Sequence, residues 1–246
     1  MTARPTEPDE INTPRPALSL VFPVFDEVEN LGELIDTALQ ITDRLTGDFE
    51  IVLVDDGSRD GSAELIDALC ARHSRIRSLR HESNIGYGAA LRSGLRYARG
   101  ELVFFSDADL QFDLLEIEKL LEHSDRFDIV AGYRQPRRDP WPRKLLAASW
   151  GSIVRWLFDV HVRDIDCAFK LFRRHVIEAM PIASMGAFVN TEILVRAQAA
   201  GYRVQQVPVS HRRRQYGQQS GAHPRVIGRA VRELVALYRE LRETRR

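Results

Sequence analysis

The sequence contains no apolar run that approaches the roughly 20 residues needed to cross a bilayer. Its 2 cysteines, Cys70 and Cys167, lie far apart, so neither the spacing of a zinc site nor a disulfide framework is present. The first residues lack the basic start, apolar core and small-residue cleavage site of a signal peptide. We therefore expect a chain without a transmembrane helix that stays in the cytoplasm.

Two common nucleotide-binding signatures are also missing. The sequence has no P-loop, which argues against an ATPase or a kinase. The glycine-rich segment 84–94 (NIGYGAALRSG) lacks the GxGxxG spacing of dinucleotide-binding proteins. Gly86 and Gly88 in this segment instead suggest backbone that comes close to a ligand at the start of a helix.

Acidic residues are absent from one long stretch of a chain whose net charge is zero. Between residues 193 and 232 there are 8 arginines and no Asp or Glu, so the rest of the chain carries a net negative charge. This asymmetry predicts an anionic partner such as a phosphate or a lipid head group, although a solvated basic surface is the alternative. The arginines lack the interleaved aromatic residues of nucleic-acid-binding proteins, so no nucleic-acid partner is predicted.

The apolar residues predict strands and helices in alternation. The expected strands are 17–24, 49–54, 76–81, 102–105 and 128–132, and the expected helices are 30–45, 60–73, 86–98 and 141–158. This order predicts an α/β fold with a mainly parallel central sheet, helices on both faces and ligands at the carboxyl ends of the strands. Residues 1–16 are expected to form a disordered lead-in, 17–222 one domain, and 223–246 a C-terminal amphipathic helix.

Carboxylates gather at the ends of three expected strands, in PVFDEVEN, VDDGSRDGS and SDADLQ. If the last segment is extended, Asp107, Asp109 and Gln111 project to one side and offer oxygen donors to one ion. Such donors suit Mg²⁺ or Mn²⁺. A simple turn is the alternative for each segment alone, but several carboxylates at one sheet edge favour a metal-assisted nucleotide site.

The helix expected at 141–158 is rich in tryptophan and leucine and also carries Arg143, Lys144 and Arg155. This composition is typical of a segment that lies at a membrane surface, although a core helix can look the same.

Taken in order, these motifs make residues 17–240 resemble family 2 glycosyltransferases of the GT-A fold, in particular the dolichol- or polyprenyl-phosphate mannosyltransferase group. The motifs that carry the resemblance are PVFDEVEN, VDDGSRDGS, NIGYGAALRSG, SDADLQ, GYR, VRDIDCAFKLFRR, FVNTEIL and HRRRQYGQQSG. The resemblance implies a metal-dependent, inverting transfer of a hexose from a GDP-mannose or UDP-glucose type donor to a polyprenyl phosphate. It also implies a peripheral protein at the inner face of the membrane, with a separate membrane-protein partner as a further option. A transferase with another lipid or soluble acceptor, and a non-catalytic nucleotide-sugar-binding protein, are the alternatives.

The resemblance also implies roles for individual residues. The metal ligands would be Asp107, Asp109 and Gln111, with Mg²⁺ or Mn²⁺ as cofactor. The nucleotide would be bound by Pro23, Phe25, Glu27, Asp55, Asp56, Asn84, Gly88 and Asp107. The catalytic residues would be Asp109, Arg134, Asp164 and Arg214, and the acceptor would be bound by Arg143, Arg212, Arg213 and Arg214.

The sequence departs from the family pattern at three places. Asp26 replaces the usual Asn, Asp166 and Cys167 are unusual in DIDCAF, and Gln219 stands where Ser is expected.

Overall fold

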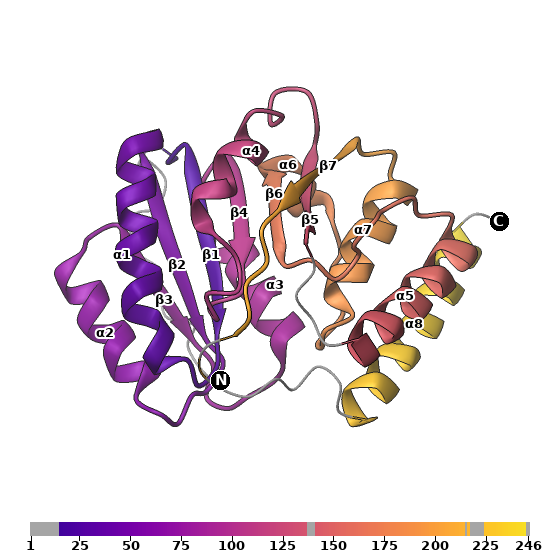
Figure 1. Ribbon diagram of the computed structural model, residues 1–246, viewed down its shortest axis with the longest axis horizontal. Coiled ribbons are helices and arrows are strands. Elements are labelled where there is room, and N and C mark those ends of the chain that lie inside the picture. The colour runs from indigo at the N-terminus through magenta and orange to yellow at the C-terminus, as the bar shows by residue number, and fades with distance from the viewer. Residues whose placement is uncertain (1–14, 137–140, 215, 217–223, 245–246) are drawn as a thin grey trace, which may run out of the picture.

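The computed structural model describes residues 15–136, 141–214, 216 and 224–244, of which 142–144, 224, 225 and 244 are described by their backbone alone. In this part of the chain seven strands form one sheet in the order β3-β2-β1-β4-β6-β5-β7, with helices around it (Figure 1). The strands are β1 (Leu18–Val24), β2 (Phe49–Asp55), β3 (Ile76–Arg80), β4 (Leu102–Ser106), β5 (Ile129–Arg134), β6 (Phe169–Arg173) and β7 (Val204–Val209). The helices are α1 (Val28–Leu45), α2 (Ser62–Arg72), α3 (Tyr87–Tyr97), the 3₁₀ helix η1 (Leu114–Glu116), α4 (Ile117–Leu121), α5 (Trp141–Phe158), α6 (Arg174–Ala179), α7 (Val189–Ala199) and α8 (Pro224–Thr244).

The sheet is mainly parallel, as the sequence predicted. Strands β1 to β4 run in the same direction, and β5 pairs in parallel with β7. The exception is β6, which is antiparallel to both β4 and β5. The sequence pattern did not predict β6 because its second residue is Lys170, a residue type that is rarely buried but here has no exposed surface. Strand β7 and helices α6 and α7 were also not predicted.

Helix α3 packs closely on the sheet, and this packing positions the segment that precedes the helix. Gly94 lies so near the sheet that an added Cβ would meet Val21 Cγ1 at 2.5 Å and Val54 Cγ2 at 2.9 Å. The larger of two hydrophobic clusters surrounds β1, β2 and β4, with α1 and α3 packed against them. Since β1, β2 and β4 are parallel neighbours, their carboxyl ends open on one edge of this core.

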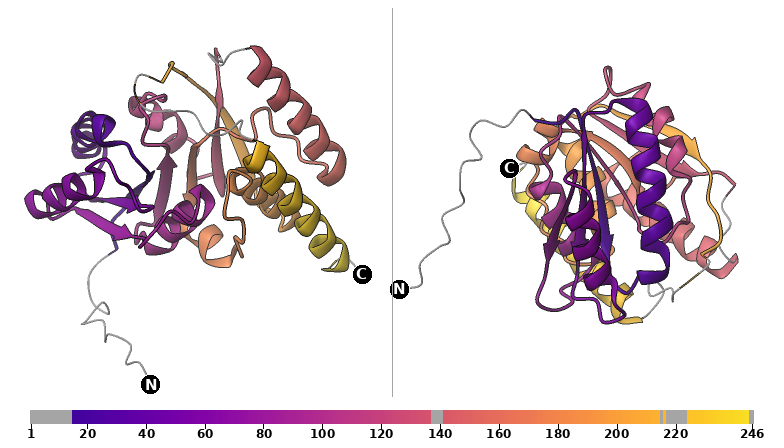
Figure 2. Two further views of the ribbon diagram at one scale, coloured as in Figure 1. Left: turned by 90° about the horizontal axis from the view of Figure 1, so that it is seen from below. Right: turned by 90° about the vertical axis from the view of Figure 1, so that its left-hand side faces the viewer.

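The C-terminal helix α8 packs on the body of the protein. Leu234 and Leu237 are buried in the smaller cluster, and the rings of Phe158 and Tyr238 meet edge to face at 5.9 Å. Arg196 on α7 adds two hydrogen bonds to Glu240, of 2.7 and 2.8 Å. Of the positions that the sequence left open for this helix, the structure shows docking on its own domain, beside α5 (Figures 1 and 2).

Helix α5 has one packed face and one open face. Val154 is fully buried, and Trp150 donates a 3.2 Å hydrogen bond from Nε1 to Thr191 Oγ1. Trp141 and Trp156 are 75% and 83% exposed, and the same helix also exposes Leu145, Leu146 and Ile153. Helix α5 is therefore a core helix on one face and exposes apolar side chains on the other, and its position at a membrane surface stays a prediction. None of the helices in the described ranges combines the length and apolar composition that crossing a bilayer requires.

Candidate active site

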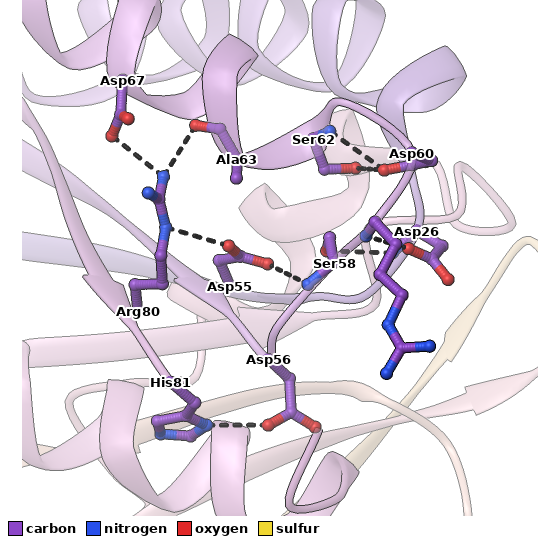
Figure 3. Close-up of polar contacts among 11 residues, drawn as sticks. Asp26, Asp55, Asp56, Ser58, Asp60, Ser62, Ala63, Asp67, Arg80 and His81 are labelled. Carbon is purple, nitrogen blue, oxygen red and sulfur yellow. Dashed lines mark hydrogen bonds and ion pairs between the residues drawn. The ribbon is translucent and has the colours of Figure 1, made fainter. Parts of the chain in front are cut away.

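The segment after β1 enters the site through a left-handed residue. Asp26 has a φ of 54°, a conformation that Asp and Asn adopt more readily than other non-glycine residues. Its carboxylate accepts a 2.7 Å hydrogen bond from the Arg59 backbone N–H, and its own N–H donates to Ser58 Oγ at 3.1 Å (Figure 3). The family's Asn and the Asp of this chain are thus both suited to the position, and the contacts join the segments after β1 and β2.

The two aspartates at the end of β2 have different partners. Asp55 accepts a 2.9 Å hydrogen bond from the Ser58 N–H and pairs with Arg80 Nε at 3.1 Å (Figure 3). Asp56 lies 2.7 Å from His81 Nδ1 and accepts hydrogen bonds from the backbone N–H groups of Ile85 and Gly86, at 3.1 and 2.9 Å. Asp56 therefore holds the segment that leads from β3 to α3, the segment that also carries Asn84.

The glycines before and within α3 permit a close approach of backbone, and the approaching backbone belongs to this chain. A Cβ on Gly86, where φ is 117°, would lie 2.3 Å from the carbonyl oxygen of Met185. A Cβ on Gly88 would lie 2.6 Å from Gly186 O and 2.7 Å from Ser184 O. The Gly88 N–H donates a 3.0 Å hydrogen bond to Met185 O. These glycines join the start of α3 to the segment before α7.

The segment after β4 bends, so our expectation of an extended DADLQ with alternating side chains was wrong. The strand ends at Ser106, and Leu110 adopts a left-handed φ of 57°. The bend folds the segment back on itself, so that Asp109 Oδ1 accepts a 3.2 Å hydrogen bond from the Gln111 N–H. Gln111 in turn donates from Nε2 to Arg212 O at 3.1 Å. A local turn, rather than strand periodicity, brings these side chains together.

Asp107 is the most perturbed acid of this edge. Burial and the neighbouring carboxylate of Asp109 raise its pKa from 3.8 to about 7, while Tyr87, Arg134 and Lys170 act in the opposite direction. One of its oxygens, Oδ1, is buried and has no hydrogen-bond partner among the described residues. An oxygen in this state is suited to a cation that arrives with a ligand.

Arg134 and Asp164 form a two-point ion pair. Arg134 Nε and Nη2 lie 2.6 and 2.7 Å from the two oxygens of Asp164, and the two side chains are only 6% and 10% exposed. Arg134 still lowers the pKa of Asp107 through its charge. The pair therefore places an oriented positive charge near the acidic edge.

Arg214 reaches the acidic edge from the segment after β7. It pairs with Glu27 and lies 3.4 Å from Asp109 Oδ2. Burial raises the pKa of Glu27 and Asp109 adds to this effect, whereas Arg214 and Asn30 oppose it. The arginine that the resemblance assigned to the acceptor thus contacts a predicted nucleotide residue and a predicted metal ligand.

The remaining predicted residues lie at or around this edge. Pro23 is buried in β1, Phe25 is 42% exposed and Asn84 is exposed. Arg212 pairs with Asp113 at 2.7 Å, and Arg213 is exposed. The side chain of Arg143 lies outside the described residues, as do the placements of Gly217 and Gln219.

Sequence reasoning missed a buried lysine beside this site. Lys170 Nζ donates to Asn190 Oδ1 at 2.8 Å, to Ile165 O at 3.4 Å and to Cys167 O. Burial lowers its pKa, yet its charge still favours the ionised form of Asp107. The lysine within the apolar run AFKLF was the signal that could have identified it.

The donor set fits a divalent metal ion. Asp107 and Asp109 offer hard carboxylate oxygens, and the charge of Asp109 raises the pKa of Asp107. Across the described residues no group of three or more His, Cys, Asp or Glu side chains is placed to hold a metal. The fit is therefore to an ion that takes part of its coordination from substrate oxygens or water.

The acidic site, with arginines around it, lies at the carboxyl ends of neighbouring parallel strands, where open α/β sheets bind their ligands, and the fold is that of GT-A glycosyltransferases. The family model of glycosyl transferase family 2 matches residues 19–180, and the chain belongs to that family. The predicted fold class and family are thereby confirmed.

One relative is undecaprenyl-phosphate 4-deoxy-4-formamido-L-arabinose transferase of Aeromonas hydrophila subsp. hydrophila. It is 34% identical over 209 residues, which are 84% of this chain and 63% of that protein. The chain therefore spans less than two thirds of the length of this relative.

The solved structures that share the fold include glucosyl-3-phosphoglycerate synthase from Mycobacterium tuberculosis. Its complex with Mn²⁺, UDP-glucose and phosphoglyceric acid has a TM-score of 0.69 and 18% identity, over 92% of this chain and 79% of that one. The complex with Mn²⁺, UDP and glucosyl-3-phosphoglycerate has a TM-score of 0.63 and 21% identity, over 92% and 77% of the two chains.

Proposed function

We propose that the protein transfers a hexose from a UDP- or GDP-sugar to a polyprenyl phosphate, with inversion, at the cytoplasmic face of the membrane. The observation that carries the proposal is the carboxylate pair Asp107 and Asp109 with Arg134 and Arg214 beside it. The 34% identical relative, which by its name acts on undecaprenyl phosphate, supports a lipid phosphate as the acceptor.

The donor is bound at the ends of β1, β2 and β4. In this proposal Glu27, Asp55 and the exposed ring of Phe25 bind the nucleoside, while Asp56 holds the segment 81–86 in place. Asp107 and Asp109, with Gln111, would hold Mg²⁺ or Mn²⁺, which neutralises the negative charge of the diphosphate. Arg134, oriented by Asp164, adds a fixed positive charge for the leaving group.

The acceptor requires little acid–base chemistry from the protein. A phosphate monoester is already an anion at neutral pH, so its oxygen can attack the anomeric carbon without a strong general base. The task of the protein is to hold two anionic substrates together in line, and arginines do this through charge-assisted hydrogen bonds. Arg212, Arg213 and Arg214 lie on the segment that passes the acidic edge and are our candidates for this role.

The open face of α5 supports a peripheral membrane position. Its exposed tryptophans and leucines can insert at the level of the lipid head groups. Nearby arginines contribute about 1 kcal/mol each next to an anionic leaflet.

The test is a transfer assay with labelled UDP- and GDP-hexoses, Mn²⁺ or Mg²⁺, and either a short polyprenyl phosphate or 3-phosphoglycerate. We expect label in the butanol extract only with the polyprenyl phosphate, and none with Asp109→Ala. Transfer to 3-phosphoglycerate alone would support the alternative, a soluble phosphorylated acceptor, which the structural likeness to glucosyl-3-phosphoglycerate synthase favours. No transfer with any pair would overturn the proposal.

A further inference from the structure

The guanidinium of Arg214 joins the ends of two strands that are distant in sequence. It contacts Glu27 after β1 and Asp109 after β4, and the three side chains are only 16%, 10% and 8% exposed. A contact so protected from water is a structural element of this state of the site rather than a chance surface pair.

In each of the two carboxylates, one oxygen accepts a local hydrogen bond and the other contacts Arg214. Glu27 uses Oε2 to accept from Asn30 Nδ2 at 2.5 Å and presents Oε1 to Arg214. Asp109 uses Oδ1 to accept from the Gln111 N–H at 3.2 Å and presents Oδ2 to Arg214. Each acid is thus oriented by its own segment, and both remaining oxygens converge on one cation.

The contacted oxygen of Asp109 belongs to the carboxylate pair that fits a divalent metal. Two cations cannot share one oxygen at close range without strong repulsion, which is stronger in a site with little exposure to water than in bulk solvent. Arg214 and a metal at Asp109 are therefore alternatives. When a metal ion supplies positive charge at Asp109, the attraction that holds Arg214 there is weakened.

We propose that Arg214 is the internal counter-ion of the unloaded donor site, and that loading of metal and nucleotide sugar releases it to bind the acceptor phosphate. This inference rests on the proposed function and deepens it, because one side chain then couples the two substrates. The acceptor phosphate therefore binds tightly only after the donor has bound, because Arg214 is then available to it. By thermodynamic linkage, acceptor phosphate held by Arg214 also strengthens metal binding.

The first experiment measures Mn²⁺ binding to the full chain without nucleotide or acceptor, from the electron paramagnetic resonance signal of free Mn²⁺. We expect Arg214→Gln to bind Mn²⁺ roughly tenfold more tightly than the wild type, because the competitor is gone. Arg214→Lys keeps the charge but loses the planar five-donor fork that contacts both carboxylates, so its affinity for Mn²⁺ should lie between the two. The matched control is Arg213→Gln, which removes the same charge one residue away and should bind Mn²⁺ as the wild type does. Equal affinities for Arg214→Gln and the wild type, or weaker binding by the variant, overturn the proposal.

A second experiment uses only the wild-type protein, so it does not depend on a variant that folds. Arginines are modified with phenylglyoxal, and the modification of Arg214 is followed by mass spectrometry with and without Mn²⁺. If Mn²⁺ releases Arg214, it should increase the modification of Arg214 several-fold. The modification of Arg77, which pairs with Glu50 at a distance of 2.8 Å and lies away from this edge, should stay constant. Unchanged or reduced modification of Arg214 contradicts release. Neither experiment contains a sugar donor, so a failed transfer assay would refute the proposed function without deciding this inference.

Discussion

Replacing Asp107 with Asn should change how the stability of the metal-free protein depends on pH. Burial and Asp109 raise the pKa of this carboxyl from 3.8 to about 7. The native state therefore keeps a proton, between about pH 4 and pH 7, that the unfolded chain releases. Because the native state binds the extra proton, the free energy of unfolding falls as the pH rises through this window, and the deficit is fully present above about pH 7.

The magnitude follows from the two pKa values. Each pKa unit corresponds to about 1.4 kcal/mol, which sets a ceiling of about 4 kcal/mol for Asp107. Solvent screening at the open side of the site lowers the expected loss to about 2–4 kcal/mol. Asp107→Asn has no charge to desolvate, so this loss should be absent from the variant.

The assay is chemical denaturation in EDTA at several pH values between about 4 and 8, with the difference between variant and wild type as the measured quantity. The variant should gain about 2–4 kcal/mol relative to the wild type across this range. The control is Asp125→Asn, whose side chain is 98% exposed and whose difference should stay flat. Adding Mn²⁺ at about pH 8 should stabilise the wild type but not Asp107→Asn. Parallel pH curves for Asp107→Asn and the wild type would refute the reasoning about this site.

Three further outcomes are expected. Asp109→Asn should reduce transfer at least about a hundredfold with the fold intact by circular dichroism, and EDTA should do the same to the wild type; full activity without metal contradicts this. Asp164→Asn removes the carboxylate that contacts Arg134 at two points and should lower the free energy of unfolding by about 2–4 kcal/mol, measured by denaturant titration; a change below about 0.5 kcal/mol would show that the pair is dispensable. Trp156→Ser should weaken co-sedimentation with anionic liposomes several-fold, whereas Trp150→Phe, on the packed face, should not; equal binding by both variants argues against insertion of α5.

Local sequence patterns predicted the part of the fold whose signals are local. Strands β1 to β5 were expected close to where they lie, because β1, β2, β4 and β5 contain apolar runs and β3 falls between two expected helices. The acidic edge was expected because parallel neighbours end on the same side. The same reasoning could not find β6, since the buried Lys170 interrupts its apolar run near the start of the strand.

The bend at 107–111 shows a second limit. An alternation argument applies only while the backbone stays extended, and the left-handed Leu110 ends that condition. The faces of α5 show a third limit. Trp141, Trp150 and Trp156 look alike in sequence, and only the neighbouring elements decide that Trp150 packs against the body while the other two are exposed.

The sequence by itself determined the class of fold, the edge of the sheet at which the acids gather and the family to which the chain belongs. Only the tertiary structure decided that Arg214 meets Glu27 and Asp109, that Asp56 holds the segment before α3, and that α8 lies on its own domain. The physical reason is distance along the chain: Arg214 is 187 residues from Glu27 and 105 from Asp109. Propensity and periodicity act over one or two turns of a helix or one strand, whereas such contacts exist only after the whole sheet has brought its strand ends together.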